Sequence, residues 1–176
     1  MTDAREYRGE DLVAFALGCS FSWEAELQSA GLAPRHVEMG RNVPMYRTVV
    51  PNEPSGPFGG NLVVSMRPYR LKDVGRVAEI TGRYPGAHGA PLCWGEEGIR
   101  QLGISASMGT PDFGDAVDIR EGEVPVFWAC GVSTQCALES AGGAVPLALT
   151  HAPGHMCVLS LRDDELVEAS SQAATE

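Results

Sequence analysis

The chain has 176 residues, of which 44% are hydrophobic and 20% are charged, and its formal net charge is −10 at pH 7. This composition is ordinary for a globular protein, and the length is sufficient for a sizeable hydrophobic core. Because so acidic a surface repels phosphate backbones, we expect no nucleic-acid partner. No apolar run approaches about 18 residues, so the sequence predicts no contact with a membrane through a spanning helix.

The cysteines and the first residues bear on the compartment. The chain has five cysteines, an odd number without the regular spacing of a disulfide framework, which favours reduced thiols in a cytoplasmic protein. The first residues are charged and do not resemble a signal peptide. We expect a polar tail over residues 1–10, one domain over residues 11–161 with room for a small inserted subdomain, and a polar tail over residues 162–176.

The first third of the chain contains one predicted helix and one predicted pair of strands. The apolar residues 11–18 indicate the end of a helix or a buried strand, and a helix follows between Ser22 as N-cap and Gly31. Residues 34–48 alternate apolar and polar side chains, which predicts two half-buried strands joined by a turn at residues 40–42. This segment carries many groups that titrate or form hydrogen bonds, although an exposed strand surface can be this polar without a function: Arg35, His36, Glu38, Arg41, Asn42, Tyr46 and Arg47.

The middle of the chain alternates short predicted elements with loops. Residues 61–66 predict a strand that ends at Arg67 and Pro68, and residues 71–81 have the apolar spacing of a helix. His88 then lies in a loop of small residues. Residues 96–118 predict a short helix and an acidic loop whose aspartates are too sparse for a calcium site.

Residues 122–142 predict the central unit of the fold. The apolar run 124–129 is typical of a buried strand, Cys130 and Gly131 form a turn, and a helix begins near Ser133 and ends at Gly142. A strand that leads through a glycine turn into a helix brings free N–H groups together, which suits an anion beside Cys130 and Gln135. The alternative is an inert cysteine that packs as a small hydrophobic residue. Residues 150–156 predict a turn with His151 and His155, followed by a strand over 157–161.

This inventory favours proton transfer on a small acidic substrate. His88, His151 and His155 lie in Gly/Pro loops beside apolar strands, where catalytic groups are often placed. Arg47 and Arg67 could each hold a carboxylate through two hydrogen bonds. A zinc site built from Cys130, His151, His155 and Cys157 lacks a known ligand spacing, so we expect no metal and no cofactor.

Seven strings in order resemble the D-glutamate cyclase family: LGCSFSWE, RHVEMGRNVPMYRT, VVSMRP, HGAP, PDFGD, GEVPVFWACGVSTQ and THAPGHM. The resemblance implies a mixed α/β fold, in which a sheet with flanking helices is interleaved with a smaller α+β subdomain. It also implies a hydro-lyase that interconverts D-glutamate and 5-oxo-D-proline plus water. Family members usually carry a further segment before the first string, so we expect a truncated product, a mis-assigned start or a short member.

The implied reaction requires carboxylate clamps and two proton-transfer groups. We predict His151 and His155 as the acid and base, with His88 and Glu38 behind them, and Cys130 as a nucleophile or a lining residue. The predicted substrate-binding residues are Arg47, Arg67, Arg35, Asn42, Tyr46, Gln135 and Cys19. We expect His151, His155, Cys130 and Arg47 to converge on one pocket, and strands without cover to expose apolar surface. The alternatives are a truncated, non-catalytic ligand-binding module and a metal-dependent hydro-lyase acting on another small acid; a homo-oligomer is compatible with each.

Overall fold

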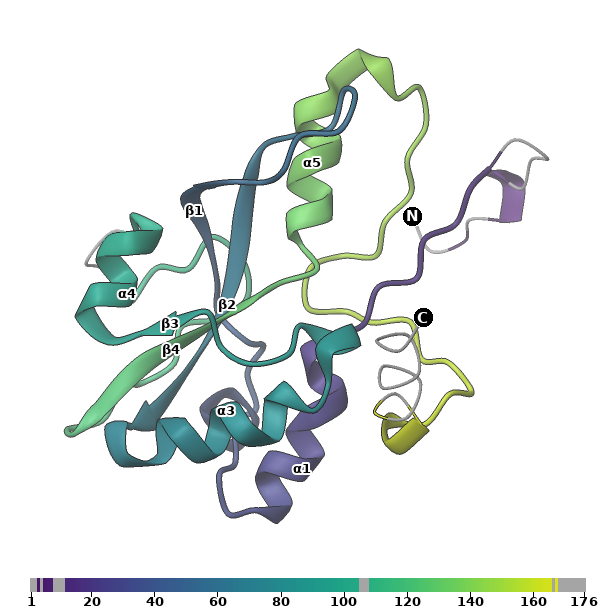
Figure 1. The fold of residues 1–176 in the computed structure, drawn as a ribbon. Helices are drawn as coiled ribbons and strands as arrows, with labels where there is room; N and C mark the ends of the chain where they lie inside the picture. Colours follow the sequence, from purple (N-terminus) through teal and green to yellow (C-terminus); the bar gives the residue numbers. More distant parts are fainter. Residues whose placement is uncertain (1–2, 4, 8–11, 105–107, 166, 168–176) are drawn as a thin grey trace.

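The computed structural model describes residues 3, 5–7, 12–104, 108–165 and 167, and its centre is a four-stranded antiparallel sheet (Figure 1). The strands lie in the order β1 (Met45–Pro51), β2 (Asn61–Arg70), β4 (Glu123–Ala129) and β3 (Cys93–Trp94). Helices pack on both faces of this sheet, which confirms the predicted mixed α/β class.

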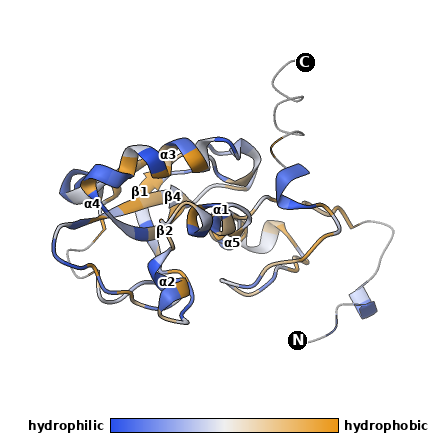
Figure 2. Cartoon of the chain, turned by 90° about the horizontal axis from the view of Figure 1, so that it is seen from below, coloured by the Kyte–Doolittle hydropathy of each residue, from blue (hydrophilic) through white to orange (hydrophobic). Residues whose placement is uncertain are grey.

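The two faces of the sheet carry different helices. The register pairs Ser65 with Trp128 and Arg67 with Val126, so these side chains share one face with Tyr69. On that face pack α1 (Glu24–Ser29), α3 (Val74–Gly82) and, at the other end, α5 (Ser133–Ala141). The opposite face packs against α4 (Gly95–Leu102). Figure 2 shows orange hydrophobic colour on the strands and both colours on α3, as expected for an amphipathic helix on a sheet.

Short 3₁₀ turns lead into or follow several helices: η2 (Ser20–Trp23), η3 (Leu71–Asp73), η4 (Pro85–Ala87) and η5 (Gly142–Ala144). A further 3₁₀ turn, η1 (Arg5–Tyr7), stands apart from the helices. The predicted helices at residues 22–31, 71–81 and 133–142 are confirmed as α1, α3 and α5. Ser22 is not the N-cap of α1, because it lies within η2 and Trp23 takes the N-cap position. In the described part of the chain, no helix has the length and apolar character needed to cross a bilayer.

The central strand is longer than the sequence predicts. Arg67 and Pro68 do not end β2, because Pro68 lies opposite Pro125 and the pairing continues to Arg70. Since neither proline has an N–H, the two form a non-hydrogen-bonded pair in which each ring nitrogen faces away from the other strand. β1 pairs with β2 only from Ser65 to Asn61, so Pro68 removes no hydrogen bond to that neighbour.

The first half of the predicted strand pair at residues 34–48 is wrong. Residues 35–38 form a one-turn helix, α2 (Arg35–Glu38), and the strand begins only at Met45. Pro34 is the extended N-cap residue before α2, and Gly40 with φ 61° allows the chain to turn away afterwards. The alternation of apolar residues wrongly indicated a strand here, since Val37 is exposed rather than buried.

Two apolar segments have no regular structure, contrary to prediction. Residues 12–18 and 157–161 are neither helix nor strand. Their large side chains are exposed, with Phe15 at 84% and Val158 at 84% of their full accessible surface. These exposed side chains lie outside the sheet and helices, so the prediction that uncovered strands expose apolar surface stays a prediction.

Candidate active site

Arg67 of β2 is the largest charged group in the core. Its side chain is fully buried, and its guanidinium lies 4.4 Å from the ring centroid of Trp23 and 5.4 Å from that of Trp128. Two N–H groups donate to Oε1 of Glu24, from Nε at 2.9 Å and from Nη2 at 2.5 Å. The buried cation is thus paired with a buried carboxylate, as a low-dielectric core requires.

Two hydroxyl groups complete the coordination of Arg67. Nη2 donates to Ser20 Oγ at 3.0 Å, and Nη1 donates to Ser65 Oγ at 3.1 Å. Ser20 belongs to the turn before α1, whereas Ser65 lies on the strand beside β4. One guanidinium therefore links the N-terminal turn to the centre of the sheet.

Glu24 is shared between Arg67 and His36. The Nε2 atom of His36 lies 3.2 Å from both carboxylate oxygens, and the imidazole stacks on Phe21 at 6.1 Å between centroids. Burial alone would raise the pKa of Glu24, but the charge of Arg67 and the contact with His36 outweigh it and lower that pKa. The carboxylate is therefore held ionised. His36 Nδ1 is buried without a hydrogen-bond partner among the described residues.

Three titratable side chains lie within reach of the charge of Arg67: Cys19, His88 and Cys130. Each is only partly buried, and the charge of Arg67 acts on all three. Burial lowers the pKa of His88, and Arg67 lowers it further, so the imidazole is neutral at neutral pH. Burial is also the largest influence on both thiols and raises their pKa values, so the thiols keep their protons at neutral pH.

The backbone fixes His88 in an uncommon conformation. Its φ of 75° lies in the left-handed region. Among the described residues, no other residue except glycine has a positive φ. The loop that carries His88 is fixed to the core, because Trp23 Nε1 donates to the Ala87 carbonyl at 3.0 Å. Gly18 packs so closely on the Gly86 carbonyl that a Cβ would not fit. These contacts hold the Cys19 turn against the His88 loop, and such strain is typical of functional sites.

Cys130 lies between the end of β4 and the start of α5. Its N–H donates to the Val63 carbonyl, which also accepts from Ser133 Oγ at 3.2 Å. No side chain caps the start of α5: Ser133 bonds to β2, and the first N–H groups of α5 donate to carbonyls of the preceding turn. The helix start supplies fewer free donors for an anion than the sequence predicts.

The structure brings some of the predicted residues together at the other end of the same face. Arg47 lies under α5, where it contacts Cys136 Sγ at 3.1 Å and Glu139 at 3.1 Å. Gln135 Nε2 donates to the carbonyl of His151 at 2.8 Å, and Gly154 packs against Asn42. The loop after α5 therefore returns along this helix towards α1 (Figure 1).

Other predicted residues lie apart from this face or have different partners. Tyr46 points to the opposite face, donates to the Met108 carbonyl at 2.7 Å, and has its pKa raised by burial to about 12. Arg35 is buried with Glu123 at 2.6 Å and Glu38 at 2.9 Å, so it ties α2 to β4. His151 and His155 are exposed, and the Nδ1 of each lies near a backbone carbonyl of its own turn.

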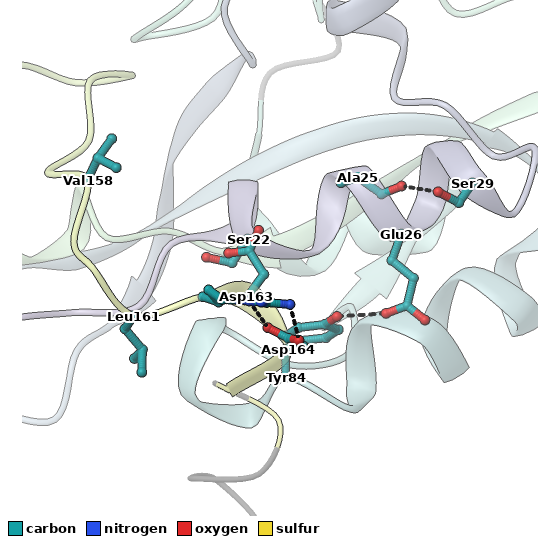
Figure 3. Close-up of a pocket in the computed structure, with 10 residues that line it drawn as sticks. Ser22, Ala25, Glu26, Ser29, Tyr84, Val158, Leu161, Asp163 and Asp164 are labelled. Atoms are coloured by element: carbon teal, nitrogen blue, oxygen red, sulfur yellow. Dashed lines mark hydrogen bonds and ion pairs between the residues drawn. The ribbon is translucent and has the colours of Figure 1, made fainter.

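An open hollow of about 580 Å³ lies beside α1, and Arg67 is not among its lining residues (Figure 3). Its carboxylates come from Glu26, Asp163 and Asp164, and its one arginine, Arg162, is paired with Asp164. Glu26 accepts from Tyr84 at 2.7 Å and pairs with Arg83. An acidic hollow repels a dicarboxylate, so we place the candidate site at Cys19, His88 and Cys130 instead. No three His, Cys, Asp or Glu side chains of the described ranges form a metal-binding group, and the zinc alternative has no support there.

Sequence reasoning missed three groups that organise this site, Ser20, Glu24 and Ser65, and it named His36 among the titratable groups of residues 34–48 without placing it in the site. One signal was available, because Arg67 interrupts an otherwise apolar strand and a buried arginine requires a buried carboxylate. Glu24, placed between Trp23 and the apolar residues of a short helix, was the candidate to consider.

The comparisons with known proteins agree with the sequence strings. The family model described as D-glutamate cyclase matches residues 13–160. A protein of Burkholderia multivorans named "Putative hydro-lyase" is 59% identical over 157 residues, covering 89% of this chain and 58% of its own length. Proteins of the same printed name from Rubrobacter xylanophilus and Mycolicibacterium gilvum are 56% and 53% identical, covering 90% and 95% of this chain and 59% and 62% of their own lengths. The chain thus spans about three fifths of the length of these relatives. It belongs to the D-glutamate cyclase family.

Proposed function

We propose that this chain carries the proton-transfer site of a hydro-lyase that interconverts D-glutamate and 5-oxo-D-proline plus water. The family membership supports the reaction class. The observation that carries the assignment is the group of His88, Cys19 and Cys130 within reach of the charge of a buried, charge-paired arginine. It offers one neutral base and two protonated acids within a partly buried site.

The proposed reaction is a redistribution of protons around one new bond. D-Glutamate enters with an ammonium group and two carboxylates, and its nitrogen bonds to the γ-carboxyl carbon while one carbon–oxygen bond breaks. The nitrogen loses two protons, and the departing oxygen gains two protons and leaves as water. A base is therefore needed at the nitrogen and an acid at the oxygen.

His88 is the base in this proposal. A neutral imidazole can accept a proton from the ammonium group, whereas a protonated one cannot. Burial and the charge of Arg67 both favour the neutral form. His88 is better placed than His151 or His155, because exposed imidazoles exchange protons with bulk water rather than with a bound substrate.

Arg67 acts through its field rather than by contact with substrate. It is fully buried and bonded to Glu24, Ser20 and Ser65, so a substrate carboxylate could reach it only by displacing these partners. Arg47, whose side chain is 45% exposed, is the clamp that remains available for a carboxylate. Asn42 and Gln135 lie near the same loop and stay candidate substrate contacts.

The test compares two matched histidine variants in the purified 176-residue chain. NMR follows D-glutamate and 5-oxo-D-proline in both directions, with the L-isomers as controls. Asparagine tolerates a positive φ, so His88→Asn removes the titrating ring with little backbone strain. We expect turnover to fall ~100-fold or more, as for loss of a general base, with substrate binding nearly kept. We expect His151→Asn to have the smaller effect.

Two other outcomes would change the assignment. A larger loss in His151→Asn would move the base to the exposed loop. Binding of D-glutamate without turnover in the unmodified chain would favour a ligand-binding module.

A further inference from the structure

Two cysteine turns occupy equivalent positions on either side of Arg67. Cys19 precedes η2 and α1, and Cys130 precedes α5, so each thiol lies just before a helix on the same sheet face. The sequences agree around them: both have a phenylalanine three or four residues earlier, a serine three residues later, and a Ser-Ala-Gly at the helix end. The two turns thus present the same chemistry from two separate parts of the chain.

The local geometry of the two thiols is also the same. The backbone N–H of Phe21 lowers the pKa of the Cys19 thiol, and the backbone N–H of Val132 lowers that of Cys130, each from two residues further along the chain. Arg67 binds Ser20, the neighbour of Cys19, and Ser65, which pairs with Trp128 near Cys130. Phe21 and Cys130 pack on one apolar cluster. Both sulfurs therefore lie at the same site.

We propose that Cys19 and Cys130 are the two acids that protonate the departing γ-carboxyl oxygen. This inference rests on the proposed function and extends it, because cyclisation must place two protons on that oxygen. Each thiol gives one proton to the oxygen as the carbon–oxygen bond breaks. The two protons that the amine releases, through His88, restore the thiols, so no atom or electron is lost.

The surroundings suit donation rather than nucleophilic attack. Burial raises the pKa of both thiols, and a negative charge on Cys19 or Cys136 would raise the pKa of Cys130 further. A protonated thiol is a proton donor, whereas only the thiolate is a good nucleophile. Once a proton is given, the N–H groups of Phe21 and Val132 and the charge of Arg67 stabilise the transient thiolate.

The experiment measures exchange of ¹⁸O from labelled water into the γ-carboxylate of D-glutamate, together with cyclisation. The variants are Cys19→Ser, Cys130→Ser and the double variant. Serine keeps the size and the hydrogen bond, but its hydroxyl is a much weaker acid. Cys93→Ser is the matched control, because Cys93 is also half-buried but packs on the opposite face.

We expect each single variant to lose ~100-fold or more in both rates while D-glutamate binding and the melting temperature stay close to those of the control. The double variant should be little worse than either single variant, since residues that act as a unit are not additive. In the unmodified chain the rate should fall at alkaline pH as a thiol ionises. Each single variant should keep such a limb from its remaining thiol, and the double variant should lack it.

The outcomes separate the inference from the proposed function. If the unmodified chain is active and the rates of its serine variants lie within about threefold of the control rate, a difference no larger than that of independent sites, the two-acid role is wrong. The cyclase proposal would then remain intact. A covalent thioester trapped on either cysteine also overturns it, because the thiol would then be a nucleophile. An unmodified chain without exchange or cyclisation overturns both.

Discussion

Arg67 and Arg47 lie on the same face of the sheet, and both stack on aromatic rings, yet they are held in different ways. Arg67 is fully buried among Trp23, Trp128 and Glu24. Arg47 lies 5.1 Å from the Phe113 centroid, but its side chain is 45% exposed and that of its partner Glu139 is 60% exposed. Of these two arginines, one therefore lies inside the core and the other at its edge.

This difference indicates which arginine can bind a substrate. Exchange of Glu139 for a substrate carboxylate costs little, because an exposed ion pair contributes about 0–1 kcal/mol. Removal of Glu24 from Arg67 would leave a buried charge unpaired, at about 3–5 kcal/mol. Both arginines look like carboxylate clamps in the sequence, but only Arg47 can serve as one at a small cost.

The largest expected effect is on stability, from Arg67→Lys measured beside Arg47→Lys by urea unfolding. Lysine keeps the charge of Arg67 but cannot reach Glu24, Ser20 and Ser65 together from one planar group. We expect a loss of about 3–5 kcal/mol for Arg67→Lys and below about 1 kcal/mol for Arg47→Lys. If Arg67→Lys does not fold, Glu24→Gln provides the same comparison. Equal, small losses in the free energy of unfolding at both positions would contradict the burial of Arg67 as a paired charge.

The next effect concerns the pH dependence of stability. The folded-state pKa of Glu24 is lowered from its ordinary 4.5 by Arg67 and His36, which outweigh burial. Between the two pKa values the unfolded state binds more protons, so this contribution is complete above pH 4.5 and is lost as pH falls through the folded-state pKa. Thermal melts from pH 7 to pH 3 should show a shallower acid slope for Glu24→Gln than for the unmodified chain. Glu139→Gln should keep the unmodified slope, because water screens that exposed pair.

The sequence predicted the elements that depend on local pattern. The apolar run of β4, the glycine turn after it and the cap at Gly142 lie within one continuous stretch, and α3 has a clear helical period. The one-turn helix α2 was missed, because four residues are too few to show a period. Its apolar neighbours alternate by chance, and Val37 is exposed.

The site was harder to predict because its contacts are distant in sequence. Arg67 and Glu24 are 43 residues apart, and a single sequence does not show which carboxylate pairs with a buried arginine. The sequence did place His88, Cys19 and Cys130 among the candidates, since each lies in a turn of small residues. It could not rank them above His151 and His155, because burial, which sets the pKa values, depends on packing by α1 and the sheet.

The smallest expected effect tests Arg47 as the remaining carboxylate clamp. In an active chain, Arg47→Lys should raise the KM for D-glutamate about tenfold, or about 1.4 kcal/mol, because an ammonium group cannot match two carboxylate oxygens at once. Turnover should change little, since a clamp holds substrate and transition state alike. Arg100→Lys is the matched control: Arg100 is also an exposed arginine paired with a glutamate, Glu97, but it lies on α4 behind the sheet. An unchanged KM in Arg47→Lys would leave Arg47 as a partner of α5 and move carboxylate binding to Gln135 and Asn42. A fall in kcat with no change in KM would instead place Arg47 against the reacting carboxylate, in contact with the γ-carboxyl group in the transition state.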